Sequence, residues 1–106
     1  MKKIAAVTVL YNPTKKIIQN ISGYIDKVDK VYVIDNSNDS NKKLLIDNKK
    51  IEYLPNYTNL GISNSLNKAC NLAIDEGYEF LLTMDQDSLF EKNEFQNIKS
   101  VKTTIK

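Results

Sequence analysis

Residues 4–13 read IAAVTVLYNP, an uninterrupted run of apolar and β-branched residues that stops at a turn-forming Tyr-Asn-Pro. Such a short run predicts a buried strand that ends in a loop. The same pattern recurs three times along the chain. The further runs are VYVID at 31–35, IEYL at 51–54 before Pro55, and EFLLTM at 79–84, and polar or turn-forming residues follow each of them.

Between these runs, apolar residues recur at helical spacing. One helix is expected after an N-cap at Thr14, with its apolar face formed by Ile17, Ile18, Ile21, Ile25 and Val28. A short helix is expected over 41–48, with Leu44 and Leu45 inward. Gly61 opens a long helix that Gly77 ends. A last helix is expected from about Lys92 to Ile105.

Strands that alternate with helices predict an α/β fold, with a mostly parallel sheet and helices on both faces. We expect residues 1–106 to form a single domain. Ligands of such sheets bind at the carboxyl ends of the strands. The polar clusters of this sequence follow the strands at those ends, which predicts a binding site there.

Composition excludes several classes of function. The net charge of +2 is too small to indicate binding to nucleic acid. The chain has one cysteine and no histidine, so it offers neither a thiol–imidazole pair nor a zinc site made of histidine and cysteine. Any metal would be held by oxygen ligands, which favours Mg²⁺ or Mn²⁺. No apolar run approaches the roughly 20 residues that span a bilayer, and we expect a cytoplasmic location, with any association with the inner membrane face arising elsewhere.

Asp85 and Asp87 are the first candidates for chemistry. They directly follow the fourth predicted strand, and in extended backbone residues i and i+2 point to the same side. Both carboxylates could therefore converge on one divalent cation that neutralises a diphosphate. The alternative is an ordinary polar turn after a strand.

Two further pairs of residues are candidates on position alone. Asp35 and Asn36 end the second strand, where they would either accept hydrogen bonds from a ligand or begin an Asx turn. Asn59 and Gly61 precede the long helix, whose N-terminal N–H groups attract anions. The alternative for this second pair is a plain junction between loop and helix.

Tyr11 and Pro13 form the last candidate pair, after the first strand. The tyrosine ring would stack on a base, or it would simply cover the edge of the sheet. The remaining tyrosines are interpreted as structural, namely Tyr24, Tyr32, Tyr53, Tyr57 and Tyr78.

Taken together and in this order, four segments resemble family 2 glycosyltransferases, most closely the rhamnosyltransferase-like branch. The resemblance extends from about Val7 to Leu89. Its segments are VTVLYNP at 7–13, VIDNS at 33–37, NLGISNSLN at 59–67 and LLTMDQDS at 81–88.

The resemblance implies the GT-A fold, a doubly wound sheet like half of a Rossmann fold, and a nucleoside-diphosphate sugar as donor, with dTDP-rhamnose as the specific expectation. It also implies inverting transfer to a saccharide or lipid-linked acceptor with Mn²⁺ or Mg²⁺. By this resemblance, Tyr11 and Pro13 would line the base pocket, and Asp35 would bond the pyrimidine with Asn36 beside it. Asn59 and Gly61 would border the nucleotide. Asp85 would approach the ribose and the metal, and Asp87 would be the main metal ligand.

Members of this family are longer, and their second half binds the acceptor and supplies a general base. No residue before Lys106 matches that base. We therefore expect the N-terminal, donor-binding half of a catalytic domain, with no catalytic residue of its own and an exposed surface through which copies of the chain could associate. A non-catalytic nucleotide-sugar-binding module or degenerate fragment is the alternative. A receiver-like regulatory domain is disfavoured, because the first strand ends without a carboxylate.

Overall fold

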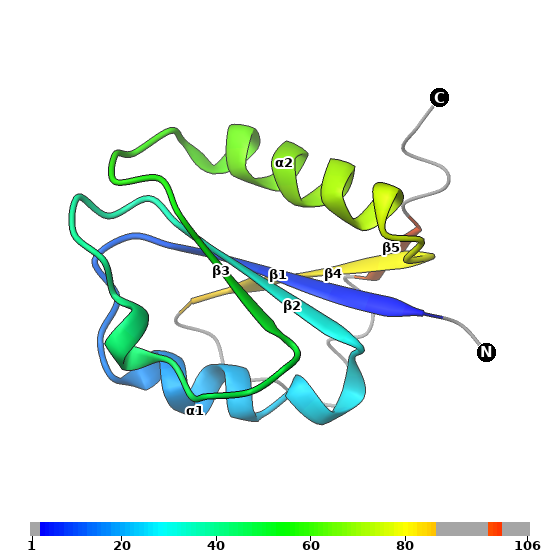
Figure 1. Cartoon of the computed structure of the whole chain (residues 1–106), viewed down its shortest axis with the longest axis horizontal. Helices are drawn as coiled ribbons and strands as arrows, with labels where there is room; N and C mark the ends of the chain where they lie inside the picture. The colour runs from blue at the N-terminus through cyan, green and yellow to red at the C-terminus, as the bar shows by residue number, and fades with distance from the viewer. Residues whose placement is uncertain (1–2, 87–97, 101–106) are drawn as a thin grey trace.

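The computed structural model describes residues 3–86 and 98–100 of the chain, and Figure 1 shows how its elements are arranged. Strands and helices alternate from the N-terminus as the apolar runs predict. The elements, with η for a 3₁₀ turn, are β1 Ile4–Leu10, α1 Lys16–Ser22, η1 Ile25–Lys27, β2 Lys30–Asp35, η2 Lys42–Leu44, β3 Ile51–Pro55, α2 Ile62–Asp75, β4 Phe80–Asp85 and β5 Ile98–Ser100.

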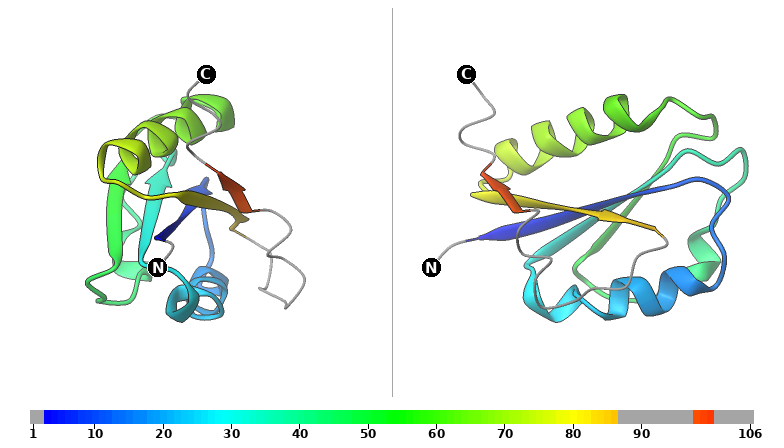
Figure 2. Two further views of the ribbon diagram at one scale, coloured as in Figure 1. Left: turned by 90° about the vertical axis from the view of Figure 1, so that its right-hand side faces the viewer. Right: turned by 180° about the vertical axis from the view of Figure 1, so that it is seen from behind.

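The strands form one sheet in the order β3-β2-β1-β4-β5. The first four strands are parallel, and β5 runs antiparallel to β4. α2 lies over one face of the sheet, whereas α1 and η1 lie over the other, as the views of Figure 2 show from two sides. The predicted α/β fold, with a mostly parallel sheet covered on both faces, is confirmed.

Alternation along the strands divides the buried side chains into two cores, because successive residues of a strand point to opposite faces. Val31 and Val33 of β2 pack with Ile17 and Ile21 on the α1 side. The intervening residues of β2 belong to the core on the α2 side, which contains Ala5, Val7, Tyr32, Ile34, Ala69, Ala73 and Leu81. The face to which a residue belongs therefore follows from its position along its strand.

The first helix is shorter than predicted. α1 ends at Ser22, and the N–H of Gly23 bonds to the carbonyls of Gln19 and Asn20 at 3.1 and 3.2 Å. The chain then makes the separate turn η1, and both Ile25 in this turn and Val28 directly after it are still buried against the sheet. The apolar periodicity correctly predicts that these residues are buried, but it does not predict the break between α1 and η1.

The start of this helix and the predicted helix over 41–48 also differ from expectation. The N-cap position of α1 falls at Lys15, although the Thr14 hydroxyl accepts a hydrogen bond from the Lys16 N–H at 3.3 Å. The segment 41–48 contains only the single turn η2. Leu44 and Leu45 nevertheless pack against the core on the α1 side, as predicted.

The prediction of a last helix from Lys92 to Ile105 is wrong at Ile98–Ser100, and its other residues lie outside the described part of the chain. These three residues form β5 and pair with Phe80–Leu82 of β4. Without them, that side of β4 would present unpaired N–H and C=O groups at the edge of the sheet. Hydrogen bonding to the neighbouring strand thus outweighs the helical spacing of the apolar residues.

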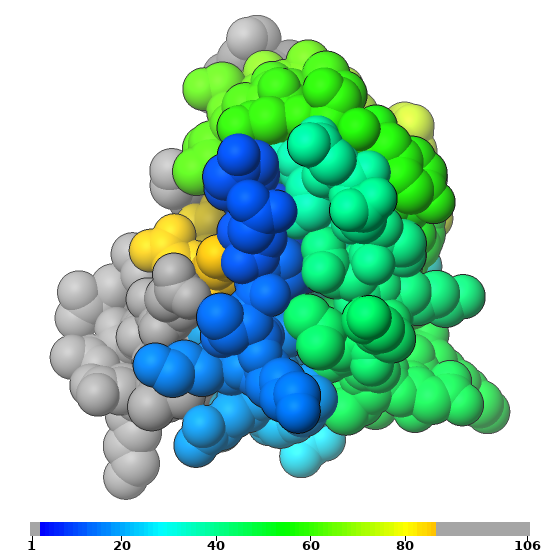
Figure 3. All heavy atoms as spheres, turned by 90° about the vertical axis from the view of Figure 1, so that its left-hand side faces the viewer, coloured from blue at the N-terminus to red at the C-terminus, as the bar shows by residue number. Residues whose placement is uncertain are grey.

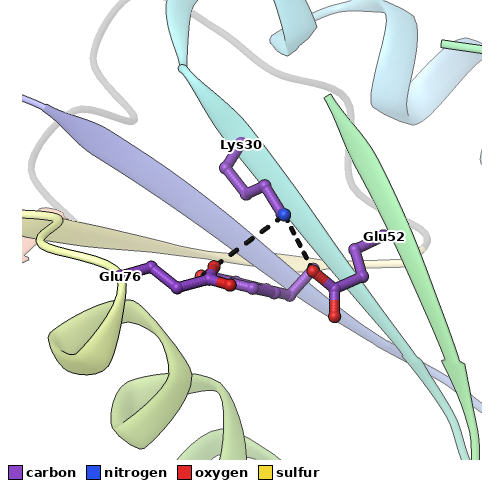
Figure 4. A network of polar contacts seen from close by, with 4 residues as sticks. Lys30, Glu52 and Glu76 are labelled. Carbon is purple, nitrogen blue, oxygen red and sulfur yellow. Dashed lines mark hydrogen bonds and ion pairs between the residues drawn. The ribbon is translucent and has the colours of Figure 1, made fainter. Parts of the chain in front are cut away.

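The C-terminal end of α2 is attached to the sheet by polar contacts. The Tyr32 hydroxyl, on a fully buried ring of β2, donates a hydrogen bond to Glu76. Lys30 lies between two carboxylates, 2.7 Å from Glu52 and 3.8 Å from Glu76 (Figure 4). Burial, together with the Glu76 hydrogen bond, raises the pKa of the Tyr32 hydroxyl well above its ordinary value, so this group remains a donor throughout the physiological range.

We expect Tyr32→Phe to lower the free energy of unfolding by about 1 kcal/mol, because one hydrogen bond to a partly hydrated carboxylate is lost while the ring stays packed. Urea denaturation at neutral pH measures the change. Tyr57→Phe is the matched control, since that ring is exposed and its hydroxyl change should be nearly neutral. Equal effects of the two substitutions would show that the Tyr32–Glu76 bond contributes no stability.

Candidate functional site

The carboxyl ends of the four parallel strands meet at one edge of the sheet. Figure 3 looks onto this edge: the segment after β1, in blue, lies between the segment after β2, in teal, and the end of β4, in orange, with the approach to α2, in green, above them. After β1 the chain leads to β2 on one side, whereas β4 pairs with β1 on the other. The ends of β1 and β4 therefore form the switch point of the sheet, where ligands of open α/β folds bind.

An open hollow of about 530 Å³ lies at this switch point. Val9 and Asp85 stand side by side in the ladder between β1 and β4, and both belong to the face covered by α2. The opposite wall is the segment that leads into α2. The hollow is lined by Val9, Tyr11, Asn36, Asn59, Gly61, Ile62, Asp85 and Gln86.

Five of the site residues predicted from the sequence line this hollow together, namely Tyr11, Asn36, Asn59, Gly61 and Asp85. They come from four separate segments of the chain. Pro13 is half-buried in the loop after β1 and is not part of the lining, and neither is Asp35. Asp87 lies outside the described residues, so its expected role as a metal ligand stays a prediction.

Asp35 points to the opposite face of the sheet from the hollow. It shares the parity of Val31 and Val33, whose side chains pack on the α1 side. Its side chain is buried, and its oxygens accept hydrogen bonds from the Ser37 N–H, the Tyr53 hydroxyl and the Asn41 amide at 3.0, 2.6 and 3.0 Å. The Asx turn that the sequence left open is therefore present.

These contacts also set the ionisation of Asp35. Burial alone would raise the pKa of the carboxyl, but the hydrogen bonds from Tyr53, Asn41 and Ser37 favour the charged form and hold the pKa below its ordinary value. Tyr53, which is interpreted as structural from the sequence, thus contacts one of the predicted site residues. The register would have indicated it, because Tyr53 pairs with Val33 and so lies diagonally across from Asp35 on the same face.

Asn36 has the opposite parity and joins the end of β2 to the start of α2. Its amide group donates to the Ser65 hydroxyl at 3.0 Å, and its carbonyl oxygen accepts a hydrogen bond from Asn56 at 2.7 Å. Ser65 also donates to the Gly61 carbonyl at 3.0 Å. This buried network fixes the N-terminus of α2 beside the hollow.

The start of α2 presents backbone donors to the hollow. Gly61 holds the N-cap position with a φ of 85°, a conformation that residues with a side chain rarely adopt. No side chain caps the helix at this position, and the first N–H groups of any helix have no partner within it. The Asn59 side chain accepts the Gly61 N–H at 3.0 Å and fixes the approach. The result is a region of positive partial charge suited to an anion.

The loop after β1 is held from both neighbouring strands. The Gln86 side chain accepts the Tyr11 N–H at 2.8 Å and donates to the Tyr11 carbonyl at 3.2 Å. On the other side, the Ser37 hydroxyl accepts the Asn12 N–H at 2.8 Å. In the sequence, Gln86 stands between the two aspartates, and no local pattern predicts this contact. Only the pairing of β4 with β1 brings it to this loop.

Asp85 is the exposed carboxylate of the hollow. The Asn20 side chain donates to its backbone carbonyl at 3.2 Å, which ties the end of β4 to α1. Within residues 3–86 and 98–100, no cluster of three or more His, Cys, Asp or Glu side chains that could hold a metal ion is found. The hollow therefore combines one acidic group, one exposed aromatic ring and the N-terminus of a helix.

Comparison with known proteins adds to this geometry. A protein-family model described as glycosyl transferase family 2 matches residues 6–100, which is most of the chain. The chain belongs to glycosyl transferase family 2. A search of the curated proteins finds no match.

Membership of glycosyl transferase family 2 gives the chain a general role in glycosyl transfer, with a nucleotide sugar and an acceptor as its partners. The parallel sheet with its flanking helices agrees with the nucleotide-sugar-binding, Rossmann-like fold of the family. No helix in the described part of this family 2 chain is long and apolar enough to cross a membrane.

The lowered pKa of Asp35 makes the stability of the fold depend on pH. Because its folded-state pKa lies below the ordinary value of about 3.9, ionised Asp35 stabilises the fold above that value, and this contribution is lost as the pH falls through the lowered pKa. We expect Asp35→Asn to lower the free energy of unfolding by about 1–3 kcal/mol at neutral pH and to weaken the loss of stability below about pH 4.

Urea denaturation across a pH series measures both effects. Asp39→Asn is the control, because Asp39 is exposed in the same loop and its substitution should change neither the stability nor its pH dependence. If the free energy of unfolding fell as steeply with decreasing pH in Asp35→Asn as in the wild type, ionised Asp35 would not be the stabilising group.

Proposed function

We propose that the chain binds a nucleoside-diphosphate sugar in the hollow at the ends of β1 and β4 and serves as the donor-binding part of a glycosyltransferase. The observation that carries the proposal is the convergence of Tyr11, Gly61 and Asp85, from three separate segments, on one hollow. Each offers what a different part of a nucleotide sugar needs, and the family to which the chain belongs transfers sugars.

Tyr11 would contact the base or ribose, because the residue is 54% exposed and lines the hollow. The N-terminus of α2 would attract the diphosphate through its unpaired N–H groups and the helix dipole. Asn36 and Asn59 hold that helix start in place and border the nucleotide. The pyrimidine contact expected of Asp35 and the base contact expected of Pro13 stay predictions, since neither residue lines the hollow.

Asp85 and Asp87 are the proposed ligands of a divalent metal, Mn²⁺ or Mg²⁺. Asp85 fits this role because its carboxylate is exposed in the hollow and oxygen is the ligand that hard cations prefer. When bound, the metal would offset the negative charge of the leaving diphosphate. The residues of the chain would hold the nucleotide and orient the sugar toward the open side of the hollow.

The proposed reaction is inverting transfer to a saccharide or lipid-linked acceptor. A hydroxyl of the acceptor would attack the anomeric carbon as the bond to the diphosphate breaks, and a general base would take the hydroxyl proton. We propose dTDP-rhamnose as the donor, on the likeness of LLTMDQDS at 81–88 to the rhamnosyltransferase-like branch.

Calorimetric titration with UDP and dTDP, with and without Mn²⁺, tests the proposal. We expect saturable binding that Mn²⁺ strengthens, and that Asp85→Asn weakens by roughly tenfold or more, since a charged ligand becomes neutral. Asp87→Ala should abolish the effect of Mn²⁺. Asp75→Asn is the matched control, because that exposed carboxylate lies at the other end of α2, roughly 20 Å away along the helix axis.

Absence of nucleotide binding by the wild-type chain would refute the proposed site. Binding that Asp85→Asn and Asp75→Asn affect equally would refute the role of Asp85. An assay of sugar transfer and donor hydrolysis, with donor and a lipid-linked acceptor, separates the proposed enzyme from the alternative. Binding without either reaction would identify a non-catalytic nucleotide-sugar-binding module.

A further inference from the structure

Gln86 lies directly beyond the end of β4, beside the loop that follows β1. The ladder between β1 and β4 ends at the pair Val9 and Asp85, where the two main chains begin to part. One residue beyond the end of β4, the Gln86 carboxamide makes two hydrogen bonds to the backbone of Tyr11, at 2.8 Å to its N–H and 3.2 Å to its carbonyl. A side-chain amide has the same donor and acceptor as a peptide group, so it extends the ladder where the main chain can no longer do so.

This pairing joins two groups that face the same ligand space. Tyr11 places its exposed ring on the rim of the hollow, and Asp85, next to Gln86, places its carboxylate in it. The segment before α2 is held separately, through Asn36 and Ser65. Among the described contacts, the Gln86 side chain is therefore the link between the loop after β1 and the end of β4 beyond the ladder.

The loop after β1 contains a strained residue, which hydrogen bonds from the neighbouring segments hold in place. Asn12 adopts a positive φ of 46°, a conformation that costs free energy in a residue with a side chain. Its N–H is held by Ser37 from the β2 side. Gln86 holds the preceding residue from the β4 side, so the backbone carrying the Tyr11 ring is fixed from both directions.

We propose that Gln86 is a positioning residue, which holds the Tyr11 ring and the Asp85 carboxylate at the separation that a bound nucleoside diphosphate requires. This inference rests on the proposed function. Gln86 acts through Tyr11 and Asp85, because both hydrogen bonds of its amide group go to the Tyr11 backbone. Without these hydrogen bonds, the Tyr11 ring and the Asp85 carboxylate would both still be present, but the distance between them would vary.

Gln86→Met tests the inference, because methionine keeps the length of the side chain and removes both hydrogen bonds. We expect Kd for UDP in the presence of Mn²⁺ to rise roughly tenfold, since ordering the loop would then oppose binding. Exchange of the Tyr11 amide hydrogen should become faster, because that N–H loses its acceptor. Gln19→Met is the matched control, as Gln19 is exposed on α1, and should change neither quantity.

Gln86→Glu provides a readout that a merely structural role would not change. At neutral pH the carboxylate still accepts the Tyr11 N–H but cannot donate to the Tyr11 carbonyl. Once protonated, it regains a donor and mimics the amide. Because an ordinary glutamate carboxyl titrates at about pH 4.3, we expect its Kd relative to that of the wild type at the same pH to recover as the pH falls from about 6 toward 4, whereas the ratio for Gln86→Met should stay constant.

The outcomes separate the two proposals. No binding of UDP by the wild-type chain would contradict the proposed function. Wild-type binding with an unchanged Kd in Gln86→Met would contradict the role of Gln86 and leave the proposed function standing. A lower thermal midpoint in Gln86→Met without a change in Kd would likewise overturn the inference, because it would show that the two hydrogen bonds serve only stability.

Discussion

Parallel pairing of β1 with β2 on one side and β4 on the other is the constraint on which the rest of the structure depends. It places β1 in the interior of the sheet, where the elements on either side cover both of its faces. It also sends the chain away from β1 in one direction and brings it back on the other side, which opens the edge of the sheet between the ends of β1 and β4. The hollow lies at that opening because the ladder between β1 and β4 ends there, at Val9 and Asp85.

The helix α2, whose start borders the hollow, is fixed at both ends by contacts with β2 and with the residue that directly follows it. Tyr32 bonds to Glu76 beyond the C-terminus of α2, and Asn36 bonds to Ser65 in its first turn. Because Tyr32 and Asn36 share the parity of the α2 face, β2 and the residue after it hold the helix near both of its ends. The same parity sends Asp35 to the other face, where it orders the loop after β2 through Tyr53 and Asn41.

Much of this could be predicted from the sequence, because buried strands and the long helix carry strong local patterns. The four apolar runs became β1 to β4, and five candidate residues line one hollow. What local patterns lack is pairing. β5 forms because it bonds to β4, Tyr53 reaches Asp35 through the register of β2 and β3, and Gln86 meets Tyr11 only because β4 lies beside β1. Counting parity from Val31 would have placed Asp35 away from Asn36, since that argument needs only the strand itself.

The central claim is that metal and diphosphate bind between the ends of β1 and β4 on the α2 face. Paramagnetic broadening of amide NMR signals by Mn²⁺ in the presence of UDP tests it most directly, because the broadening falls off steeply with distance from the ion. The account predicts that the signals of Tyr11, Gly61, Asp85 and Gln86 broaden first, while those of Lys30 and Glu76, at the opposite end of the sheet, stay sharp. Broadening centred on Lys30 and Glu76, or spread evenly over the chain, would contradict it.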